Sequence, residues 1–514
     1  MDAQLQSIGH SLDTLVVGII SSSASTCAAR RNLVNVLFIT LDQFRADSYG
    51  AGGHPLVTTP ALDRLADEGV RLARHYSQAA PCAPGRAALY TGTYQMNNRV
   101  VANGSPLADR FDNVARLARR AGYVPTLFGY TDQGLDPTLA QGIDDPRLDS
   151  HDGILPGFAV GHYLPESEAT WVEYLRDLGY DVPFGWALAL RGESDRPAEY
   201  SLTGFLTGKF LEWLEIQEPG WFAHVSFLRP HPPYAAAGDY SRLYDPADVE
   251  LPIAPVDAHQ RHPLHEIALG VAASAAPLEE ESMRHLRAQY YGMISEVDSH
   301  LGRIISRLEE RGEYGETLIV VTSDHGDQLG DHGLIEKLGF FPQSYNILGI
   351  WRDPRLDLAG RVIENYTENV DIAPTLADAL GLEIPAQFDG RVMTPLFEGR
   401  DVEWRTCAHY EWDYRAFFIG QTAQPWPWDR SLSRQNLAVA TNEDTAYVQF
   451  GDGSYLCFDL LVDPTWRTAC TDLQQVFHAA QEMLVWRQEH TGRDFTDMLL
   501  GSERLGRWPS ALRR

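Results

Sequence analysis

Residues 34–43 read Val-Asn-Val-Leu-Phe-Ile-Thr-Leu-Asp-Gln, a short apolar run that is rich in β-branched residues and ends in an acid and an amide. Such a run is typical of a strand buried on both faces of a parallel sheet. Residues 318–321, Leu-Ile-Val-Val, repeat the pattern and are followed closely by Asp324 and His325. Because ligands bind beyond the carboxyl ends of the strands in such sheets, we expect Asp42, Asp324 and His325 to share one site.

Helices are expected to alternate with these strands. The clearest lies at residues 282–311, where apolar residues recur at spacings of three and four. We predict shorter helices at residues 60–76, 86–92, 112–121 and 371–380, and further strands at residues 123–128 and 221–227. This alternation predicts an α/β fold with a mostly parallel central sheet flanked by helices.

The pattern changes after about residue 400. Short strands separated by turn residues are predicted at 408–410, 437–440, 446–450 and 455–460, and a helix follows at about 471–490. We therefore divide the chain into an N-terminal extension at 1–32, a large α/β domain at 33–400 that carries the site, and a smaller C-terminal α+β domain with an antiparallel sheet and a tail at 401–514. Residues 236–280 are predicted to form a long surface excursion over the face of the site.

Composition excludes some classes of partner. The 514 residues carry a formal net charge of −28, which argues against nucleic acid or an anionic membrane as a partner but not against a small anionic substrate. Five cysteines without C-x-x-C spacing do not resemble a disulfide framework or a structural zinc site, so we expect reduced thiols. The apolar run at 15–20 is too short to span a bilayer and no Lys or Arg precedes it. We therefore expect a cytoplasmic protein, with the periplasm as the alternative.

The polar residues at the two strand ends suit a divalent cation. Carboxylate and amide oxygens from Asp42, Gln43 and Asp324 favour a hard cation, and an imidazole from His325 shifts the preference toward Mn, Fe or Zn. A divalent ion would neutralise the two carboxylates, so that little charge remains to repel a monoanion. Taken alone, Asp324 or His325 also fits a helix cap.

Three further residues are candidates for chemistry on an anion. Arg86 is expected as a buried cation, and Lys337 follows Asp324 closely enough for a loop to return its ammonium to the site. His231 lies in Arg-Pro-His-Pro-Pro at 229–233, where three prolines stiffen the loop and favour a fixed general acid. Each candidate has an alternative interpretation. Arg86 could serve only in recognition, Lys337 could be a surface lysine, and His231 could be a turn histidine without a chemical role.

The segment Cys82-Ala83-Pro84-Gly85-Arg86, followed by Ala-Ala-Leu-Tyr-Thr-Gly, has the pattern C-x-P-x-R. With this motif the chain resembles the sulfatases of the alkaline phosphatase-like superfamily, and more narrowly the bacterial phosphonate monoester hydrolases, which are also known as phosphodiesterases or arylsulfatases. The stretches that carry the resemblance are 41–43, 81–97, 101–104, 127–131, 229–233, 322–326, 409–415 and 458–464. The resemblance covers about residues 33–500 and implies an alkaline phosphatase-like fold.

The resemblance also implies a modified nucleophile and a metal. A formylglycine-generating maturation enzyme would oxidise Cys82 to the aldehyde formylglycine, whose hydrate attacks phosphorus or sulfur and passes through a covalent intermediate. Asp42, Gln43, Asp324 and His325 would hold one divalent cation together with the oxygen at position 82. Manganese is the ion that we expect, with calcium, iron or zinc as alternatives.

The remaining roles follow from the same resemblance. Arg86 and Lys337 would stabilise the anion, His231 would assist the leaving group, and Asn103 and Tyr130 would contact the non-bridging oxygens or the substituent. Relatives of this kind form homotetramers, so a homotetramer is expected here.

Three departures from the family pattern bear on substrate range. Gly85 stands where Ser is commoner, Asp132 stands where a hydroxyl is expected, and Asn-Ile-Leu-Gly at 346–349 replaces the usual basic residue followed by Ile-Pro-Leu. We expect a metal-dependent hydrolase of phosphonate monoesters and phosphodiesters, with sulfate monoesters as secondary substrates. The alternatives are an arylsulfatase or a choline sulfatase with Trp412 and Tyr414 in an aromatic cage, a transferase to an alcohol, and a catalytically silent metal-binding homologue in which Cys82 stays unmodified.

Overall fold

The computed structural model describes residues 33–148, 150, 153–165, 169–182, 185–415 and 433–491, and the backbone of two short strands, β13 (Leu499–Leu500) and β14 (Gly506–Arg507). The predictions made for residues 1–32, and for the tail after residue 507, lie outside these ranges. Within them, no helix combines the length and the apolar character that crossing a bilayer requires.

An eight-stranded sheet forms the centre of the molecule, as predicted, and its strand order is β4-β3-β5-β1-β6-β7-β2-β8. Only β7 runs antiparallel to its neighbours, so the sheet is mostly parallel. Its strands are β1 (Asn35–Leu41), β2 (Val70–Tyr76), β3 (Pro125–Gly129), β4 (Ala159–Tyr163), β5 (Phe222–Phe227), β6 (Thr317–Ser323), β7 (Gly349–Arg352) and β8 (Arg361–Glu368). β1 and β6 are neighbours, and Leu41 pairs with Ser323, so Asp42 and Asp324 leave the sheet side by side.

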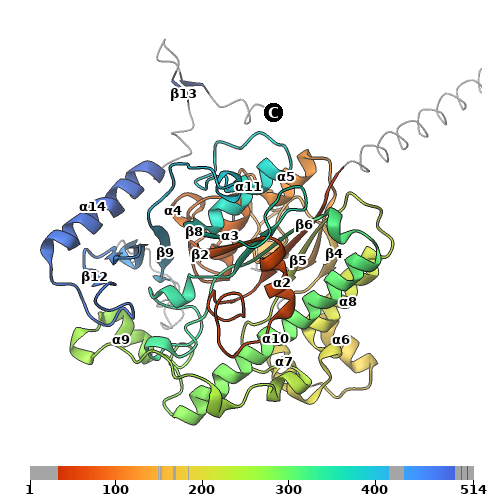
Figure 1. Ribbon diagram of the computed structural model, residues 1–514, viewed down its shortest axis with the longest axis horizontal. Helices are drawn as coiled ribbons and strands as arrows, with labels where there is room; N and C mark the ends of the chain where they lie inside the picture. Colours follow the sequence, from red (N-terminus) through yellow and green to blue (C-terminus); the bar gives the residue numbers. More distant parts are fainter. Residues whose placement is uncertain are drawn as a thin grey trace, which may run out of the picture.

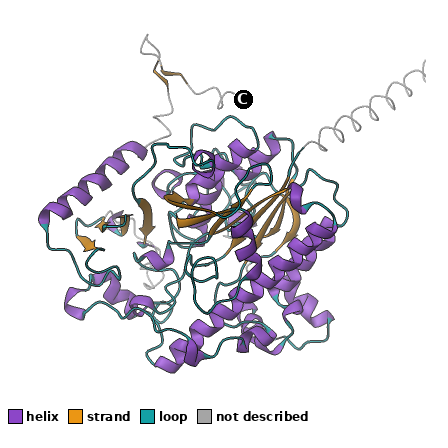
Figure 2. Cartoon of the chain, viewed as in Figure 1, coloured by secondary structure: helices purple, strands orange, loops and turns teal. Residues whose placement is uncertain are grey.

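Two apolar cores cover the faces of this sheet because side chains alternate along each strand. Leu37 and Ile39 of β1 belong to the core beneath α2 (Pro60–Glu68), α8 (Leu202–Leu214) and α10 (Glu280–Glu310). Val36 and Phe38 belong to the opposite core. That second core packs on α3 (Cys82–Thr91), α5 (Val114–Arg120) and α11 (Ile372–Ala379). Figures 1 and 2 show the two helical layers on either side of the strands. The predicted α/β class is confirmed.

The part of the chain around the main sheet also contains the helices α4 (Gln95–Asn98), α6 (Ala169–Asp177), α7 (Trp186–Arg191), α9 (Pro263–Leu269) and α12 (Thr394–Phe397). The segment 236–280 contains α9 and packs on the loop that follows β6. His332 N donates to Ile253 O at 2.7 Å, and Ile335 N donates to Ser274 O at 2.8 Å. This excursion therefore supports the loop that returns Lys337 toward the end of the sheet.

The predicted helix at 60–76 is wrong in its second half. The helix α2 ends at Glu68, and β2 starts at Val70. Gly69 interrupts the helix, and Val70 and Leu72 are buried on the sheet where β2 pairs with β7 and β8. The sequence suggests a single helix because Leu62, Leu65, Val70 and Ala73 fit a helical spacing. The pairing of residues 70–76 with distant strands overrides that local pattern.

A small antiparallel sheet lies beside the main one, to the left in Figure 1. Its order is β12-β11-β10-β9. Its elements are β9 (Ala408–Asp413), β10 (Asn436–Thr441), β11 (Thr445–Phe450), β12 (Tyr455–Asp459) and the helix α14 (Leu473–His490). One face, including Tyr410 and Val439, packs on Tyr345, and the other face packs on α14 through Trp486. The domain boundary at residue 400 stays a prediction.

Candidate active site

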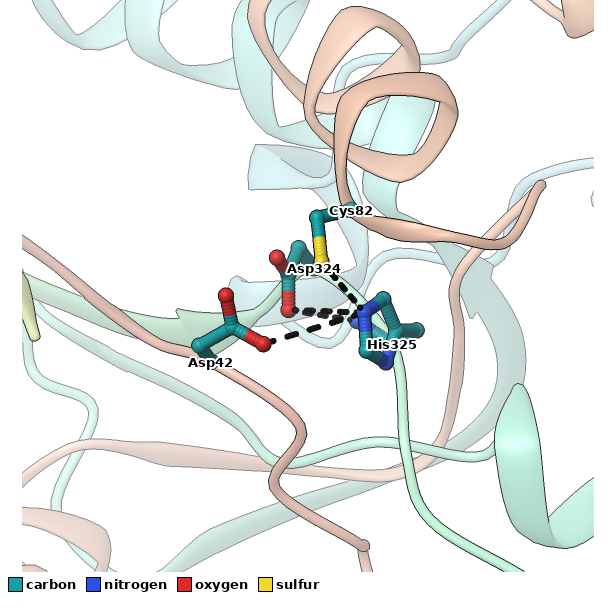
Figure 3. Close-up of side chains that lie close together, drawn as sticks. All are labelled: Asp42, Cys82, Asp324 and His325. Carbon is teal, nitrogen blue, oxygen red and sulfur yellow. Dashed lines mark hydrogen bonds and ion pairs between the residues drawn. The ribbon is translucent and has the colours of Figure 1, made fainter. Parts of the chain in front are cut away.

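Four side chains from three distant parts of the sequence meet at the carboxyl end of the central sheet. Asp42 follows β1, Asp324 and His325 follow β6, and Cys82 is the first residue of α3. One potential ligand atom from each lies within 4.8 Å of the others, and all four residues are buried. His325 Nε2 lies 3.3 Å from Cys82 Sγ, 3.7 Å from Asp42 Oδ1 and 3.9 Å from Asp324 Oδ1. Dashed lines in Figure 3 mark these three contacts. The sequence therefore predicted this convergence correctly.

This donor set fits a divalent cation. The donor atoms are two carboxylate oxygens, an imidazole nitrogen and the Cys82 sulfur, and the oxygen and nitrogen donors among them suit Mn, Fe or Zn. Asp42 Oδ1 is buried and has no hydrogen-bond partner among the described residues. A buried carboxylate oxygen without a partner is costly, and a cation would satisfy it.

The thiol of Cys82 is in an unfavourable place for ionisation. Burial and the negative charges of Asp42, Asp324 and Asp132 raise the pKa of Cys82 well above its usual range, although Lys337 opposes them. A thiol that stays protonated is a poor nucleophile. The unmodified side chain is therefore ill suited to attack an ester by itself.

Arg86 ties the two carboxylates together. Its guanidinium is fully buried and donates from Nε to Asp324 Oδ2 at 2.8 Å and from Nη2 to Asp42 Oδ2 at 3.1 Å. Nη1 donates to Ser226 Oγ at 2.7 Å. Arg86 thus fixes one oxygen of each carboxylate and leaves Oδ1 of each facing His325 and Cys82.

Gly85 lets α3 approach the end of β6 closely. A Cβ atom at this position would lie 2.5 Å from Asp324 O and 3.0 Å from Ala79 O. Real Cβ atoms do not approach backbone oxygens so closely, so any larger residue would move α3 away from Asp324. The glycine that departs from the commoner serine is therefore required by packing in this chain.

Gln43 lies at the site but its amide is already engaged. Its Oε1 accepts from Lys337 Nζ at 3.1 Å, and its Nε2 donates to Asp327 Oδ2 at 2.6 Å. Asp327 also accepts from Tyr234 OH at 2.8 Å and from Leu329 N at 2.7 Å. Sequence reasoning missed Asp327, although the run Asp-His-Gly-Asp at 324–327 was the available signal.

His231 and Lys337 form a hydrogen-bonded pair. Lys337 Nζ lies 2.8 Å from His231 Nε2, and His231 Nδ1 lies 2.7 Å from Pro232 O. Burial and the Lys337 charge lower the pKa of His231 to about 4. Because Nδ1 faces a carbonyl, we assign the imidazole proton to Nδ1, and Nε2 accepts from the ammonium. At neutral pH the mobile proton of this pair is therefore on Lys337.

The loop that carries His231 is fixed by a buried ion pair. Arg229 donates to His231 O at 2.7 Å and to Pro233 O at 2.9 Å, and its Nε donates to Glu193 Oε2 at 3.1 Å. Both partners of the ion pair are completely buried. Sequence reasoning missed Glu193, and no local signal marks it.

The two residues predicted to contact the substrate both lie at the site. Asn103 Oδ1 accepts from Ala83 N at 3.0 Å at the start of α3. Tyr130 OH donates to Asp42, and its ring lies 4.1 Å from the Arg86 guanidinium carbon. Their predicted contacts with substrate stay predictions. By contrast, Trp412, which we considered as part of an aromatic cage in a choline sulfatase, is buried in the apolar core of the small sheet.

Comparison with known proteins agrees with this geometry. The sequence model of the Sulfatase family matches residues 34–382. The "Multifunctional alkaline phosphatase superfamily protein PehA" of Trinickia caryophylli is 35% identical over 502 residues, which cover 90% of this chain and 96% of the relative. The phosphonate monoester hydrolase of Agrobacterium radiobacter superposes with a TM-score of 0.81 at 36% identity and covers 93% of this chain and 100% of its own. The corresponding enzyme SpPMH of Silicibacter pomeroyi gives 0.80 at 33% identity, with 93% and 99% covered. The chain therefore belongs to the sulfatase family, within the alkaline phosphatase superfamily of hydrolases.

Proposed function

We propose that the chain is a metal-dependent hydrolase of phosphonate monoesters and phosphodiesters, with sulfate monoesters as secondary substrates. The observation that carries the proposal is the meeting of Asp42, Cys82, Asp324 and His325 within 4.8 Å, beside the cations of Arg86 and Lys337. The similarity to two phosphonate monoester hydrolases of known structure supports the same substrate class.

We infer that Cys82 is converted to formylglycine by a maturation enzyme. The C-x-P-x-R motif at residues 82–86 supports this, as does the position of Cys82 beside the carboxylates and the imidazole that could hold a metal ion. When present, formylglycine supplies a hydrated aldehyde whose hydroxyl is the nucleophile. One divalent cation held by Asp42, Asp324 and His325, with Gln43 alongside, would supply Lewis acidity; we expect manganese, with calcium, iron or zinc as alternatives.

The residues of the chain have separable tasks. Arg86 orients both carboxylates by binding Oδ2 of each, which leaves Oδ1 of each on the side of His325. Lys337 holds a proton at Nζ between Gln43 Oε1 and His231 Nε2. Burial lowers the pKa of Lys337, but Cys82 and the neighbouring carboxylates outweigh burial and raise it, so the ammonium keeps its proton and can stabilise negative charge on a substrate oxygen while His231 holds it in place. Arg229 holds the His231 loop through three backbone carbonyls.

The charge around position 82 supports a monoanionic substrate. Among the groups that face Cys82, three carboxylates (Asp42, Asp132 and Asp324) oppose the cations of Arg86 and Lys337. One divalent ion would leave a single positive charge, which matches an ester with one negative charge. A dianionic phosphate monoester would be bound less well.

The proposal is tested with esters that share one leaving group. The rate of para-nitrophenol release from an aryl phosphonate, a diester, a sulfate and a phosphate monoester gives the ratio of kcat/KM directly. We expect the phosphonate and the diester to lead, the sulfate to follow and the phosphate monoester to be slowest. A strong preference for the phosphate monoester would contradict the proposal. Mass analysis of the Cys82 peptide and the metal content of the same sample test the nucleophile and the cofactor.

The assembly and location of the enzyme are proposed as well. We infer a homotetramer, as expected from the family resemblance, and a cytoplasmic enzyme. Light scattering after gel filtration measures the assembly, and a monomer would contradict it. Fractionation of the source cells tests the location.

A further inference from the structure

A second cysteine and histidine face one another outside the candidate active site. Cys407 precedes β9, and its Sγ lies 3.3 Å from Nε2 of His409. The other ring nitrogen, His409 Nδ1, lies 3.3 Å from Glu368 Oε1 at the end of β8. All three side chains are buried, and Cys407 is 8% exposed. A thiol, an imidazole and a carboxylate thus stand in line.

The imidazole is held in one orientation. His409 N donates to Glu368 Oε1 at 2.8 Å, and Glu368 Oε2 accepts from Tyr94 OH at 2.6 Å. The ring of Trp486 stacks on the ring of His409 with centroids 4.6 Å apart and an interplanar angle of 4°. A carboxylate that fixes an imidazole beside a thiol is the arrangement that activates a nucleophile, whatever fold carries it.

The thiol also adjoins open space. A cavity of about 360 Å³ lies between β9 and α14, and Cys407, His409 and Trp486 are among the residues that line it. Its ionisable wall groups carry both signs: Arg391, Arg405, His478, Glu482, Glu489 and His490. Because these charges oppose one another, the cavity favours a small neutral molecule over a multiply charged one.

The protonation of His409 supports the same interpretation. Burial lowers the pKa of His409, but the neighbouring Cys407 and Glu368 outweigh burial and raise it to about 9. The His409 imidazole is therefore a stronger proton acceptor than an ordinary histidine. An imidazolium beside sulfur favours the thiolate, which is the reactive form.

We propose that Cys407 is a second reactive site, at which small neutral peroxides oxidise the thiol to a sulfenic acid with His409 as base and Glu368 as the group that orients it. The thiol proton moves to His409 Nε2, and the sulfur attacks one oxygen of hydrogen peroxide. The O–O bond breaks, and the departing hydroxide takes the proton from His409 as water. Sulfur loses two electrons and the peroxide gains them, so no further co-reactant is needed.

The experiment compares cysteines within one folded protein. Cys470 is more exposed than Cys407, whereas Cys457 is 2% exposed and lies beside Cys470. A Cys457→Ser background removes the thiol with which Cys470 would form a disulfide. The full-length protein is treated with hydrogen peroxide, sulfenic acid is trapped with dimedone, and each cysteine peptide is quantified by mass.

We expect Cys407 to be trapped faster than Cys470, although exposure alone predicts the reverse. A His409→Gln change should slow trapping at Cys407 on the order of 10²-fold, the effect of removing a positioned base, and leave Cys470 unchanged. Ester hydrolysis by the same variant checks that the fold is intact. Trapping at Cys407 that is no faster than at Cys470, or that is unaffected by His409→Gln, overturns the proposal.

Discussion

The same contact occurs at two places in this molecule with opposite consequences. At the end of the central sheet, Cys82 Sγ lies 3.3 Å from His325 Nε2, and beside the small sheet Cys407 Sγ lies 3.3 Å from His409 Nε2. Around Cys82 several carboxylates face the thiol, and burial lowers the pKa of His325. Around Cys407 the carboxylate lies behind the imidazole, and the pKa of His409 rises to about 9.

This difference shows that charge placement decides what a cysteine can do. Carboxylates beside the sulfur oppose a thiolate and create a site that suits a cation, which agrees with the metal ion and the modified side chain that we propose for Cys82. A carboxylate beyond the imidazole stabilises the imidazolium and so supports a thiolate. The distance between the cysteine sulfur and the histidine nitrogen is the same at the two sites, so this distance does not distinguish them.

Exchanging each cysteine for alanine should separate the two sites most clearly. Cys82→Ala removes the nucleophile, so we expect ester hydrolysis to fall on the order of 10³-fold or more. Cys407→Ala is the matched control. Its rate of ester hydrolysis should stay within about twofold of wild type, because Cys407 lies outside the candidate active site. Steady-state kinetics with one aryl phosphonate measures both. Equal losses in the two variants would mean that the sites are not independent.

Removal of divalent ions is the next largest effect. A chelator should lower hydrolysis by about 10²-fold or more, since a Lewis acid supplies several kcal/mol of transition-state stabilisation. Added manganese should restore the rate. Peroxide trapping at Cys407 in the same sample should not change, because Cys407 is not one of the four clustered residues that could hold the ion. Loss of Cys407 reactivity on chelation would contradict this contrast.

Lys337 sets the cationic side of the first site. Lys337→Met keeps the length of the side chain and removes the ammonium that contacts Gln43 and His231. We expect kcat to fall about 10²-fold, as for the loss of one donor to a developing oxyanion. The loss should be smaller for esters with better leaving groups if the proton of this pair assists departure. A constant loss across leaving groups would restrict Lys337 to charge stabilisation.

Much of the first site was predictable from sequence, because its chemistry stands at the ends of apolar strands. Asp42, Asp324 and His325 were placed together by that rule alone, although 281 residues separate Gln43 from Asp324. Glu193 was not predictable, since it meets Arg229 through tertiary packing and has no motif of its own.

The second site was invisible to sequence for a related reason. Glu368 and His409 are 41 residues apart, and β8, which carries Glu368, was not among the predicted strands. Its sequence alternates imperfectly, and its position in the sheet depends on β2, which the helical spacing of residues 60–76 had concealed. Cys407 could be noted only as one of several reduced thiols.

The dependence of the unfolding free energy on pH below neutrality should reveal the buried carboxylate of Glu368 at the second site. Burial raises the pKa of Glu368, but Arg405 and His409 outweigh it and lower the pKa to about 2. The stabilisation is therefore complete above the unfolded value of about 4.5 and is lost as the pH falls toward 2. We expect Glu368→Gln to cost about 3 kcal/mol of unfolding free energy at neutral pH and progressively less below pH 4.5. Denaturant unfolding across pH measures this, and a pH-independent cost would contradict it.

The smallest expected effect is a change in substrate selectivity on removing the charge of Asp132. This residue is the carboxylate beside Cys82 that departs from the expected family pattern. It is buried, has a φ of 53°, and raises the pKa of the Cys82 thiol. Asp132→Asn keeps the shape and the tolerance of left-handed backbone while removing one negative charge. A dianionic phosphate monoester should gain about tenfold in kcat/KM relative to a monoanionic diester, equivalent to about 1.4 kcal/mol. The ratio of the two substrates is the measurement, since it cancels any general loss of activity. If the ratio does not move, the selectivity for one negative charge comes from Arg86 and Lys337 alone, and Asp132 acts only on the backbone of its loop.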